Sequence, residues 1–168
     1  LARDSAVESS RARFVIIGDG HLRDELEATA RALGIEDRVD FLGNRENPAD
    51  FYPGLDVVVL TSHNEGTPLS LIEGMANSRP FVATNVGGVA DLAGATVTSD
   101  CNVKVCECGI IVEAGDAGAL AKAISMICDD ADLRVALGRR GNRFVTQNYG
   151  RERLTEDISA LYREAVAK

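Results

Sequence analysis

The sequence has no long apolar run and no excess of positive charge, and each absence excludes a class of function. No hydrophobic stretch approaches the ~20 residues that a membrane-spanning helix needs, so we expect no transmembrane segment. Lys and Arg number 18 against 26 Asp and Glu, which gives a formal net charge of −8. Such an acidic chain is poorly suited to nucleic acid or an anionic membrane surface. The chain begins at Leu1 with neither Met nor a signal-peptide pattern, so we expect a fragment of a longer protein.

Cysteine is scarce and irregularly spaced, which argues against a disulfide framework and against a zinc site. Cys101, Cys106 and Cys108 form a Cys-x4-Cys-x-Cys pattern. That spacing matches none of the usual zinc motifs, and no histidine lies near it in the sequence. We therefore expect no metal, free thiols in a surface insertion, and a reducing, cytoplasmic setting. A metal site held by these cysteines is the alternative.

Two enzyme classes are disfavoured by residues that are missing. The only histidines, His21 and His63, have no serine or cysteine partner in a recognisable nucleophile pattern, which disfavours a triad hydrolase. Gly18-Asp19-Gly20 is half of a dinucleotide fingerprint, but Arg23 stands where the third glycine belongs. A dehydrogenase is disfavoured on that ground.

The hydrophobic pattern predicts one α/β domain over residues 1–168: a Rossmann-like, doubly wound parallel sheet with helices on both faces and a helical C-terminus. Short apolar runs alternate with segments of helical period, and no repeat or linker interrupts them. Residues 94–108 have no clear period and predict a loop or an irregular hairpin. The expected strands are 13–17, 39–42, 56–60, 81–83 and 109–112, and the main helices are 21–33, 68–76, 116–127, 132–148 and 151–167.

The stretch from Thr61 to Ala76 is the most informative part of the chain. It follows the apolar run Val57–Leu60 and opens a helix, for which Thr67 is the expected N-cap and Pro68 the first helical residue. A helix N-terminus after a buried strand binds anions, because free amides and the positive end of the helix dipole point outward.

Other loops are expected at the same rim, because ligands bind at the carboxyl ends of strands in such sheets. Glycine in these loops permits either a tight turn or a close backbone approach. The expected rim segments are Gly18–Gly20, Asn44–Arg45, His63–Leu69 and Asn85–Gly88.

Glu73 is the unusual residue of this helix. At 100° per residue it shares a face with Leu69, Ile72 and Ala76, which predicts a carboxylate within a buried apolar stripe. Burying a carboxylate costs several kcal/mol unless it is hydrogen-bonded. Two interpretations follow: a ligand rich in hydroxyl groups, or a structural carboxylate bonded to backbone amides or to an arginine.

The order of these motifs is more specific than any one of them. Strands end in Gly18-Asp19-Gly20 and in Phe41-Leu42-Gly43, Glu65-Gly66-Thr67-Pro68 precedes Glu73-Gly74-Met75-Ala76, and Asn85-Val86-Gly87-Gly88-Val89 follows. The series resembles the C-terminal, nucleotide-sugar-binding half of the group-1 retaining glycosyltransferases of the GT-B architecture. The resemblance covers nearly all of residues 13–168, and the two glutamates separated by seven residues are that family's most specific motif.

The resemblance implies a role for each matching residue. Glu65, the candidate catalytic residue, would contact hydroxyls of the donor sugar near the reacting carbon without acting as a nucleophile. Glu73 would accept hydrogen bonds from the ribose hydroxyls, and Asn44 and Arg45 would lie near the base. The implied donor-binding set is Gly18, Gly20, Asn44, Arg45, Glu65, Gly66, Thr67, Pro68, Leu69, Ser70 and Glu73.

The implied reaction transfers a sugar from a nucleoside diphosphate sugar, such as a UDP or GDP sugar, to an acceptor with retention at the anomeric carbon. No cofactor and no bound metal are expected. The helix dipole and basic residues would offset the charge on the leaving diphosphate.

The chain also departs from the family's pattern. It begins after the family's strand ending in Gly-Arg and the downstream Lys-Gly, and the N-terminal acceptor domain is absent. We therefore expect the fragment alone to be inactive. Residues 95–107 form a longer stretch than in relatives, without a functional explanation. Two alternatives stay open: part of a GT-B nucleotide-sugar epimerase, and a non-catalytic assembly module whose last two helices pack on another domain or subunit.

Overall fold

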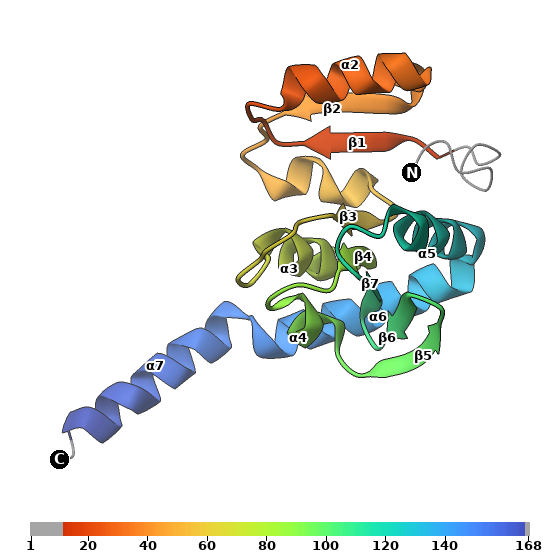
Figure 1. The fold of residues 1–168 in the computed structure, drawn as a ribbon. Helices are drawn as coiled ribbons and strands as arrows, with labels where there is room; N and C mark the ends of the chain where they lie inside the picture. The colour runs from red at the N-terminus through yellow and green to blue at the C-terminus, as the bar shows by residue number, and fades with distance from the viewer. Residues whose placement is uncertain (1–11, 167–168) are drawn as a thin grey trace.

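The computed structural model describes residues 12–166 and contains seven strands within them (Figure 1). The expectations about the first residues of the chain lie outside this range. In chain order the strands are β1 (Phe14–Ile17), β2 (Val39–Gly43), β3 (Val58–Leu60), β4 (Phe81–Thr84), β5 (Thr96–Asp100), β6 (Val103–Cys106) and β7 (Gly109–Val112).

Helices separate most of these strands, as predicted. Gly34 ends the first described helix in the left-handed conformation, at φ 67°, where glycine carries no Cβ penalty. The helices are α2 (Arg23–Leu33), α3 (Leu69–Ala76), α4 (Val89–Ala93), α5 (Ala117–Asp129), α6 (Ala131–Asn148) and α7 (Arg151–Val166), with short 3-10 turns η1 (Glu36–Arg38), η2 (Pro48–Asp50) and η3 (Tyr52–Gly54).

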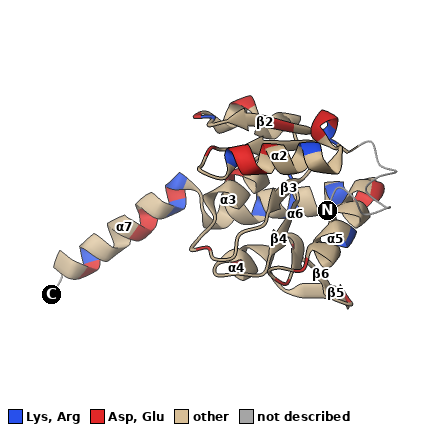
Figure 2. Ribbon diagram, turned by 45° about the horizontal axis from the view of Figure 1, so that its top comes forward, with Lys and Arg blue, Asp and Glu red and all other residues tan. Residues whose placement is uncertain are grey.

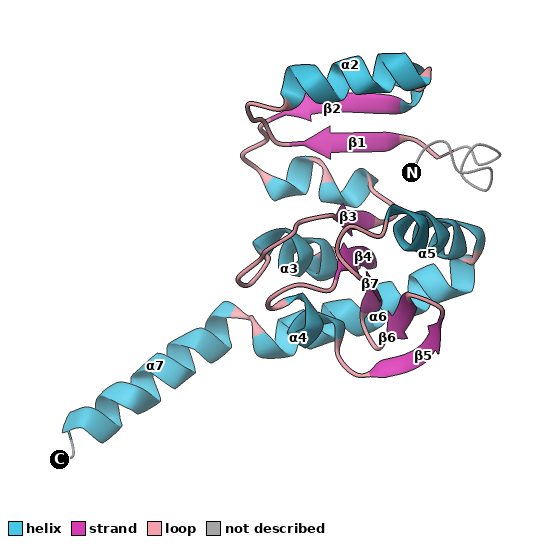
Figure 3. Cartoon of the chain, in the orientation of Figure 1, coloured by secondary structure: helices cyan, strands magenta, loops and turns pink. Residues whose placement is uncertain are grey.

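The strands form two sheets within the described residues (Figure 3). β1 and β2 pair in parallel, and a five-stranded sheet has the order β3-β4-β7-β6-β5. β3, β4 and β7 are parallel, whereas β6 and β5 run antiparallel to their neighbours. The parallel-dominated α/β fold is therefore confirmed. Of the two structures expected for residues 94–108, a loop or an irregular hairpin, the structure has the irregular hairpin. Strands β5 and β6 pair in antiparallel fashion, and their register shifts between Thr96 and Thr98.

The core lies on both faces of the five-stranded sheet. Every residue of β4 and β7 is buried. Because successive side chains of a strand point to opposite faces, Phe81 packs with Leu71 and Met75 of α3, and Val82 packs with Ile124 of α5 and with other residues of α5 and α6. Each fully buried side chain of this size contributes about 1.5–3 kcal/mol. The rim at the carboxyl ends of β3, β4 and β7 therefore rests on a rigid sandwich.

Two cysteines belong to this core. Cys106 and Cys108 are buried, while Cys101 is exposed at the turn between β5 and β6. The prediction of surface thiols is thus wrong for Cys106 and Cys108, because these residues lie in and next to β6, which pairs with the buried strand β7. Burial raises the pKa of both thiols.

No helix within residues 12–166 is long and apolar enough to cross a membrane.

Candidate functional site

The loop from Thr61 to Pro68 carries the chain from β3 to the start of α3. Pro68, at φ −73° and ψ 101°, occupies the N-cap position, and no side chain caps the helix. The prediction that Thr67 is the cap and Pro68 the first helical residue is therefore wrong by one position. The extended conformation of Pro68 places Thr67 one residue too far from the first turn. The first amides and the positive dipole end of α3 stay without a side-chain cap, which is the arrangement that receives an anion.

The buried face of α3 is the opposite of the predicted one. Leu71, Gly74 and Met75 are its buried residues, whereas Leu69 is 69% exposed. Glu73 is half-buried on the outward side of the helix. The expectation of a carboxylate within a buried apolar stripe is wrong, because apolar residues surround the helix and the period alone does not choose between its faces.

Tyr52 holds Glu73 in place. The Tyr52 hydroxyl donates to Glu73 Oε2 at 3.2 Å and to the Ser70 carbonyl oxygen at 2.9 Å. Neither an arginine nor a backbone amide, the partners considered from the sequence, makes this contact. Tyr52 is 4% exposed and packs on the Phe51 ring, with 4.4 Å between ring centroids. Burial, then the negative charge of Glu73, then their hydrogen bond raise the pKa of Tyr52, so its hydroxyl stays a neutral donor.

Sequence reasoning missed Tyr52, although part of its signal is visible. The pair Asn47-Pro48 is typical of a helix cap followed by a first-turn proline. Asn47 does accept a hydrogen bond from the Ala49 amide, at 3.2 Å. The two 3-10 turns that follow bring the Tyr52 hydroxyl to Ser70 and Glu73 of α3. A tyrosine 21 residues before a half-buried glutamate has no spacing rule that links the two.

Glu65 is fixed from the other side of the loop. The Ser62 hydroxyl donates to Glu65 Oε1 at 2.6 Å, and the Thr84 hydroxyl donates to the Ser62 carbonyl oxygen at 2.5 Å. Thr84 is the buried last residue of β4. The last residue of β4 therefore orients, through Ser62, the Glu65 carboxylate in the loop that follows the neighbouring strand β3.

Gly87 and Gly88 lie directly against the Glu65 loop. A Cβ at Gly87 would overlap the Glu65 carbonyl oxygen, and a Cβ at Gly88 would overlap the carbonyl oxygen of Gly66. The Gly88 amide donates to that same Gly66 oxygen at 2.9 Å. Of the two interpretations of this glycine pair, close backbone approach is the one that the structure supports, and the approach is of one rim loop to another. Gly87 also has φ +49°, a conformation that favours glycine.

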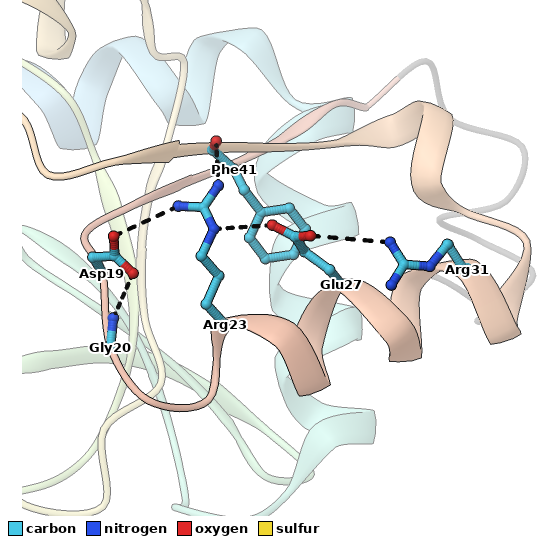
Figure 4. A network of polar contacts seen from close by, with 6 residues as sticks. All are labelled: Asp19, Gly20, Arg23, Glu27, Arg31 and Phe41. Atoms are coloured by element: carbon cyan, nitrogen blue, oxygen red, sulfur yellow. Dashed lines mark hydrogen bonds and ion pairs between the residues drawn. The ribbon is translucent and has the colours of Figure 1, made fainter.

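Arg23 ties the first glycine loop to the end of β2 (Figure 4). Its guanidinium donates to the Phe41 carbonyl oxygen at 3.2 Å, donates to Glu27 at 2.9 Å, and lies 3.9 Å from the carboxylate of Asp19. Asp19 in turn accepts from the Gly20 amide at 2.8 Å. The residue that breaks the dinucleotide fingerprint is thus the residue that orders this loop.

The remaining predicted residues lie on the same side of the molecule. Gly18, at φ +127°, donates its amide to the Gly43 carbonyl oxygen at 2.9 Å, and Asn44 and Arg45 follow as exposed residues. The loops that leave β1 and β2 and the loop between β3 and α3 all lie on the left of Figure 1. The structure thus brings Gly18 beside the segment that leads to Asn44 and Arg45, and brings Glu65 beside the Gly87–Gly88 loop.

A cavity of about 230 Å³ opens at the carboxyl ends of β3, β4 and β7. Asp116 lines it and caps α5 by accepting from the Ala119 amide at 2.8 Å. Within residues 12–166, no three His, Cys, Asp or Glu side chains form a metal-binding group. The cavity is lined by Thr61, His63, Thr84, Glu113, Gly115, Asp116, Ala117 and Leu120.

The rim therefore combines an uncapped helix start with two carboxylates that are each oriented by a hydroxyl donor. This combination can receive an anionic group together with the hydroxyls of a polar ligand. Fold and site together define a Rossmann-like domain, a class of fold whose ligands bind at the carboxyl ends of the strands.

Comparison with known proteins gives the family. A model of the family described as "Glycosyl transferases group 1" matches residues 2–144. The lipopolysaccharide core biosynthesis glycosyltransferase LpsE of Rhizobium meliloti is 31% identical over 84% of this chain and 38% of its own length. The chain belongs to the group 1 glycosyl transferases.

Solved structures agree with this assignment. The C-terminal domain of the group 1 protein LpcC of Francisella tularensis has a TM-score of 0.63 at 27% identity, over 76% of this chain and 62% of that one. Anabaena HepE, solved in complex with UDP, has a TM-score of 0.72 at 23% identity, which shows the fold, over 89% of this chain and 41% of that one. The fold is that of the GT-B glycosyltransferases. The chain spans about two fifths of the length of LpsE and HepE.

Proposed function

We propose that this chain is the donor-binding domain of a retaining glycosyltransferase, which transfers a sugar from a nucleoside diphosphate sugar to an acceptor. The observation that carries the proposal is the pair Glu65 and Glu73 on either side of the uncapped start of α3, each with an oriented carboxylate. The complex of HepE with UDP supports a nucleotide ligand for this fold.

Each part of the rim matches one part of such a donor. The first amides of α3, from Leu69 onward, take the diphosphate, because they lack a side-chain cap and lie at the positive end of the helix dipole. Glu73 takes the ribose hydroxyls: Tyr52 supplies one hydrogen bond, and an ionised carboxylate has acceptor sites for several. Gly18, Gly20, Asn44 and Arg45 complete the nucleotide side.

Glu65 faces the sugar in this arrangement. The hydrogen bond from Ser62 fixes one carboxylate oxygen, and the other accepts from a sugar hydroxyl and orients the ring. Gly66, Thr67, Pro68 and Ser70 line the turn between the sugar and the diphosphate. As the bond to the leaving diphosphate breaks, negative charge grows at the start of α3, where a preorganised dipole lowers the barrier.

The proposal needs no metal ion and assigns acceptor binding to the part of the protein outside this chain. It also keeps a cytoplasmic setting, which the free thiols of this chain, Cys101, Cys106, Cys108 and Cys128, support.

Calorimetric titration of the chain with UDP, GDP and ADP tests the proposal. We expect saturable binding of at least one nucleotide, unchanged by EDTA. If the full-length parent protein bound none of the three, the proposal would be wrong. If the parent protein converted a free nucleotide sugar into its epimer in the absence of an acceptor, it would be an epimerase instead.

A further inference from the structure

The hairpin of β5 and β6 is the part of the chain for which the sequence suggested no function, and its turn lies at the rim of the site. Val103, the first residue of β6, pairs with Val112, the last residue of β7, and Asp100 of β5 pairs with Val103. Because β6 runs antiparallel to β7, the turn at Cys101 and Asn102 lies at the same edge of the sheet as the carboxyl end of β7. The hairpin is therefore placed to act on the loops of that rim.

Three polar contacts fasten the hairpin to the loop after β7 and to α5, which lies beside β6 (Figures 1 and 2). The contacts are those of Asp100 with Lys122 at 2.6 Å, Asn102 with Asp116 at 2.7 Å, and Lys104 with Glu113 at 3.1 Å. The third contact continues from Glu113 into the loop after β4.

Glu113 links the hairpin to this loop. Its Oε1 atom accepts from Lys104 and, at 3.5 Å, from the side-chain amide of Asn85, the first residue after β4. The Asn85 backbone amide donates to the Val112 carbonyl oxygen at 2.7 Å, so backbone and side chain both tie Asn85 to the end of β7. The hydrogen bonds from Lys104 and Asn85 lower the pKa of Glu113, so its carboxylate stays charged at neutral pH and can hold both donors.

The loop that begins at Asn85 supports the loop that carries Glu65. Gly87 lies against the Glu65 carbonyl oxygen, and the Gly88 amide donates to the Gly66 carbonyl oxygen at 2.9 Å. Close-packed contacts of this kind transmit strain. The position of Asn85 therefore affects the position of Glu65.

We propose that Lys104 is a positioning residue for the donor sugar: through Glu113 and Asn85 it fixes the loop that supports Glu65. The inference rests on the proposed function, in which Glu65 contacts the sugar and the start of α3 holds the diphosphate. Losing the Lys104 contact inserts no atom into the loop, so its effect falls on Glu65 and not on the start of α3. Lys104 thus acts on the affinity that the sugar contributes and not on the affinity that the nucleotide contributes.

Titration of the full-length parent protein with nucleotide sugars and with the free nucleotides separates these two parts. The ligands are UDP-glucose, UDP-N-acetylglucosamine and GDP-mannose, each against its nucleotide, and the pair used is one whose sugar increases wild-type affinity. In Lys104→Met the affinity for the nucleotide sugar should fall about threefold, as expected for loss of one partly exposed ion pair, while the affinity for the free nucleotide stays unchanged. Lys104→Arg should restore the wild-type value.

Lys122→Met is the matched control. It removes the same charge and breaks the ion pair with Asp100 on the same hairpin, and the two lysine side chains have similar exposure, 46% for Lys122 and 38% for Lys104. It leaves the contacts of Glu113 in place, so the affinity for the nucleotide sugar should stay at the wild-type value.

Hydrogen exchange of the Gly88 amide, measured without ligand, tests the structural step by itself. Exchange should be about threefold faster in Lys104→Met than in wild type and unchanged in Lys122→Met. Adding Lys104→Met to Asn85→Ala should cause no further increase, because the path through Asn85 is already broken.

Four results would overturn the inference. The first two are unchanged Gly88 exchange in Lys104→Met and equal effects of Lys104→Met and Lys122→Met. The third is an equal loss of affinity for nucleotide sugar and free nucleotide, which would make Lys104 a merely structural residue. The fourth is a wild type in which no sugar adds to the affinity of its nucleotide. Faster Gly88 exchange in a protein that binds no nucleotide would instead refute the proposed function and support the path from Lys104 to the rim loop.

Discussion

Gly87 lies against Glu65 so closely that a Cβ at position 87 would overlap the Glu65 carbonyl oxygen. The loop after β4 is therefore a support for the loop that carries the first carboxylate of the site. With the Gly88 amide bonded to Gly66 and the Thr84 hydroxyl bonded to Ser62, three contacts hold one rim loop against the next. Substitutions in the loop after β4 should therefore change ligand binding by the loop after β3, even where they do not touch the ligand.

Gly87→Ala should weaken both the fold and nucleotide binding. The added methyl group must displace the Glu65 backbone, and φ +49° is strained for alanine, so we expect a loss of about 1–3 kcal/mol of unfolding free energy. Urea unfolding and UDP titration measure the two effects. Gly54→Ala is the control, because a Cβ there meets nothing within 4 Å. Equal effects of the two substitutions would contradict the loop contact.

Tyr52→Phe should lower nucleotide affinity about fivefold, since it removes the hydrogen bond that orients Glu73, and losing that orientation should cost about 1 kcal/mol of binding free energy. Tyr52 keeps its ring packing in this variant, so the domain stays folded. Isothermal titration gives the affinity. Tyr149→Phe serves as the matched control, because Tyr149 is 43% exposed and lies far in the sequence from the turns η2 and η3 that carry Tyr52. An unchanged affinity in Tyr52→Phe would show that Glu73 needs no positioning by this hydroxyl.

The pH dependence of stability should show the same contact. The pKa of Tyr52 is raised, so the folded protein holds this proton more tightly than the unfolded chain, whose tyrosines ionise at about pH 10. The stability contribution is complete below that pH and is lost as pH rises toward the folded-state pKa. Wild-type protein should therefore lose stability more steeply than Tyr52→Phe above about pH 10 in urea unfolding. Cys106 and Cys108 titrate in both proteins, so their effect cancels in the comparison; identical slopes would refute the assignment.

Arg23→Gln should loosen the first glycine loop. The variant loses the hydrogen bonds to Phe41 and Glu27, so we expect the free energy of unfolding to fall by about 1 kcal/mol in urea unfolding. Hydrogen exchange of the Gly20 amide should also become faster. Arg31→Gln is the control: Arg31 is mostly exposed, and its pair with Glu27 at 4.0 Å should contribute less than about 0.5 kcal/mol. If both variants lost the same unfolding free energy, Arg23 would not be the residue that orders this loop.

Periodicity and loop chemistry predicted most of the fold from the sequence. The strand expected at residues 109–112 and the helix end expected at residue 33 agree with the structure, because each depends on neighbouring residues in the sequence. The face that α3 buries was not predictable in this way. Leu69 and Leu71 are both apolar, and only tertiary packing exposes one and buries the other.

The site was predictable in outline and not in its contacts. Glu65 and Glu73 stand out by their spacing around a helix start. Their partners, Ser62 and Tyr52, depend on how the loops and turns fold back on α3. The sequence identified Gly87 as a glycine of a rim loop. Its contact with Glu65 was not predictable, because it depends on the pairing of β3 with β4.

The central claim is that Glu73 binds the nucleotide, and a UDP titration of three proteins tests it most directly. The proteins are wild type, Glu73→Gln, and Glu156→Gln, which makes the same change at an exposed position of helix α7. Loss of charged hydrogen bonds to a ligand costs about 1.5–3 kcal/mol, so Glu73→Gln should bind about 10- to 100-fold more weakly than wild type. Glu156→Gln should bind as wild type does. If UDP bound the wild type and Glu73→Gln with equal affinity, the site would lie elsewhere and the account would be wrong.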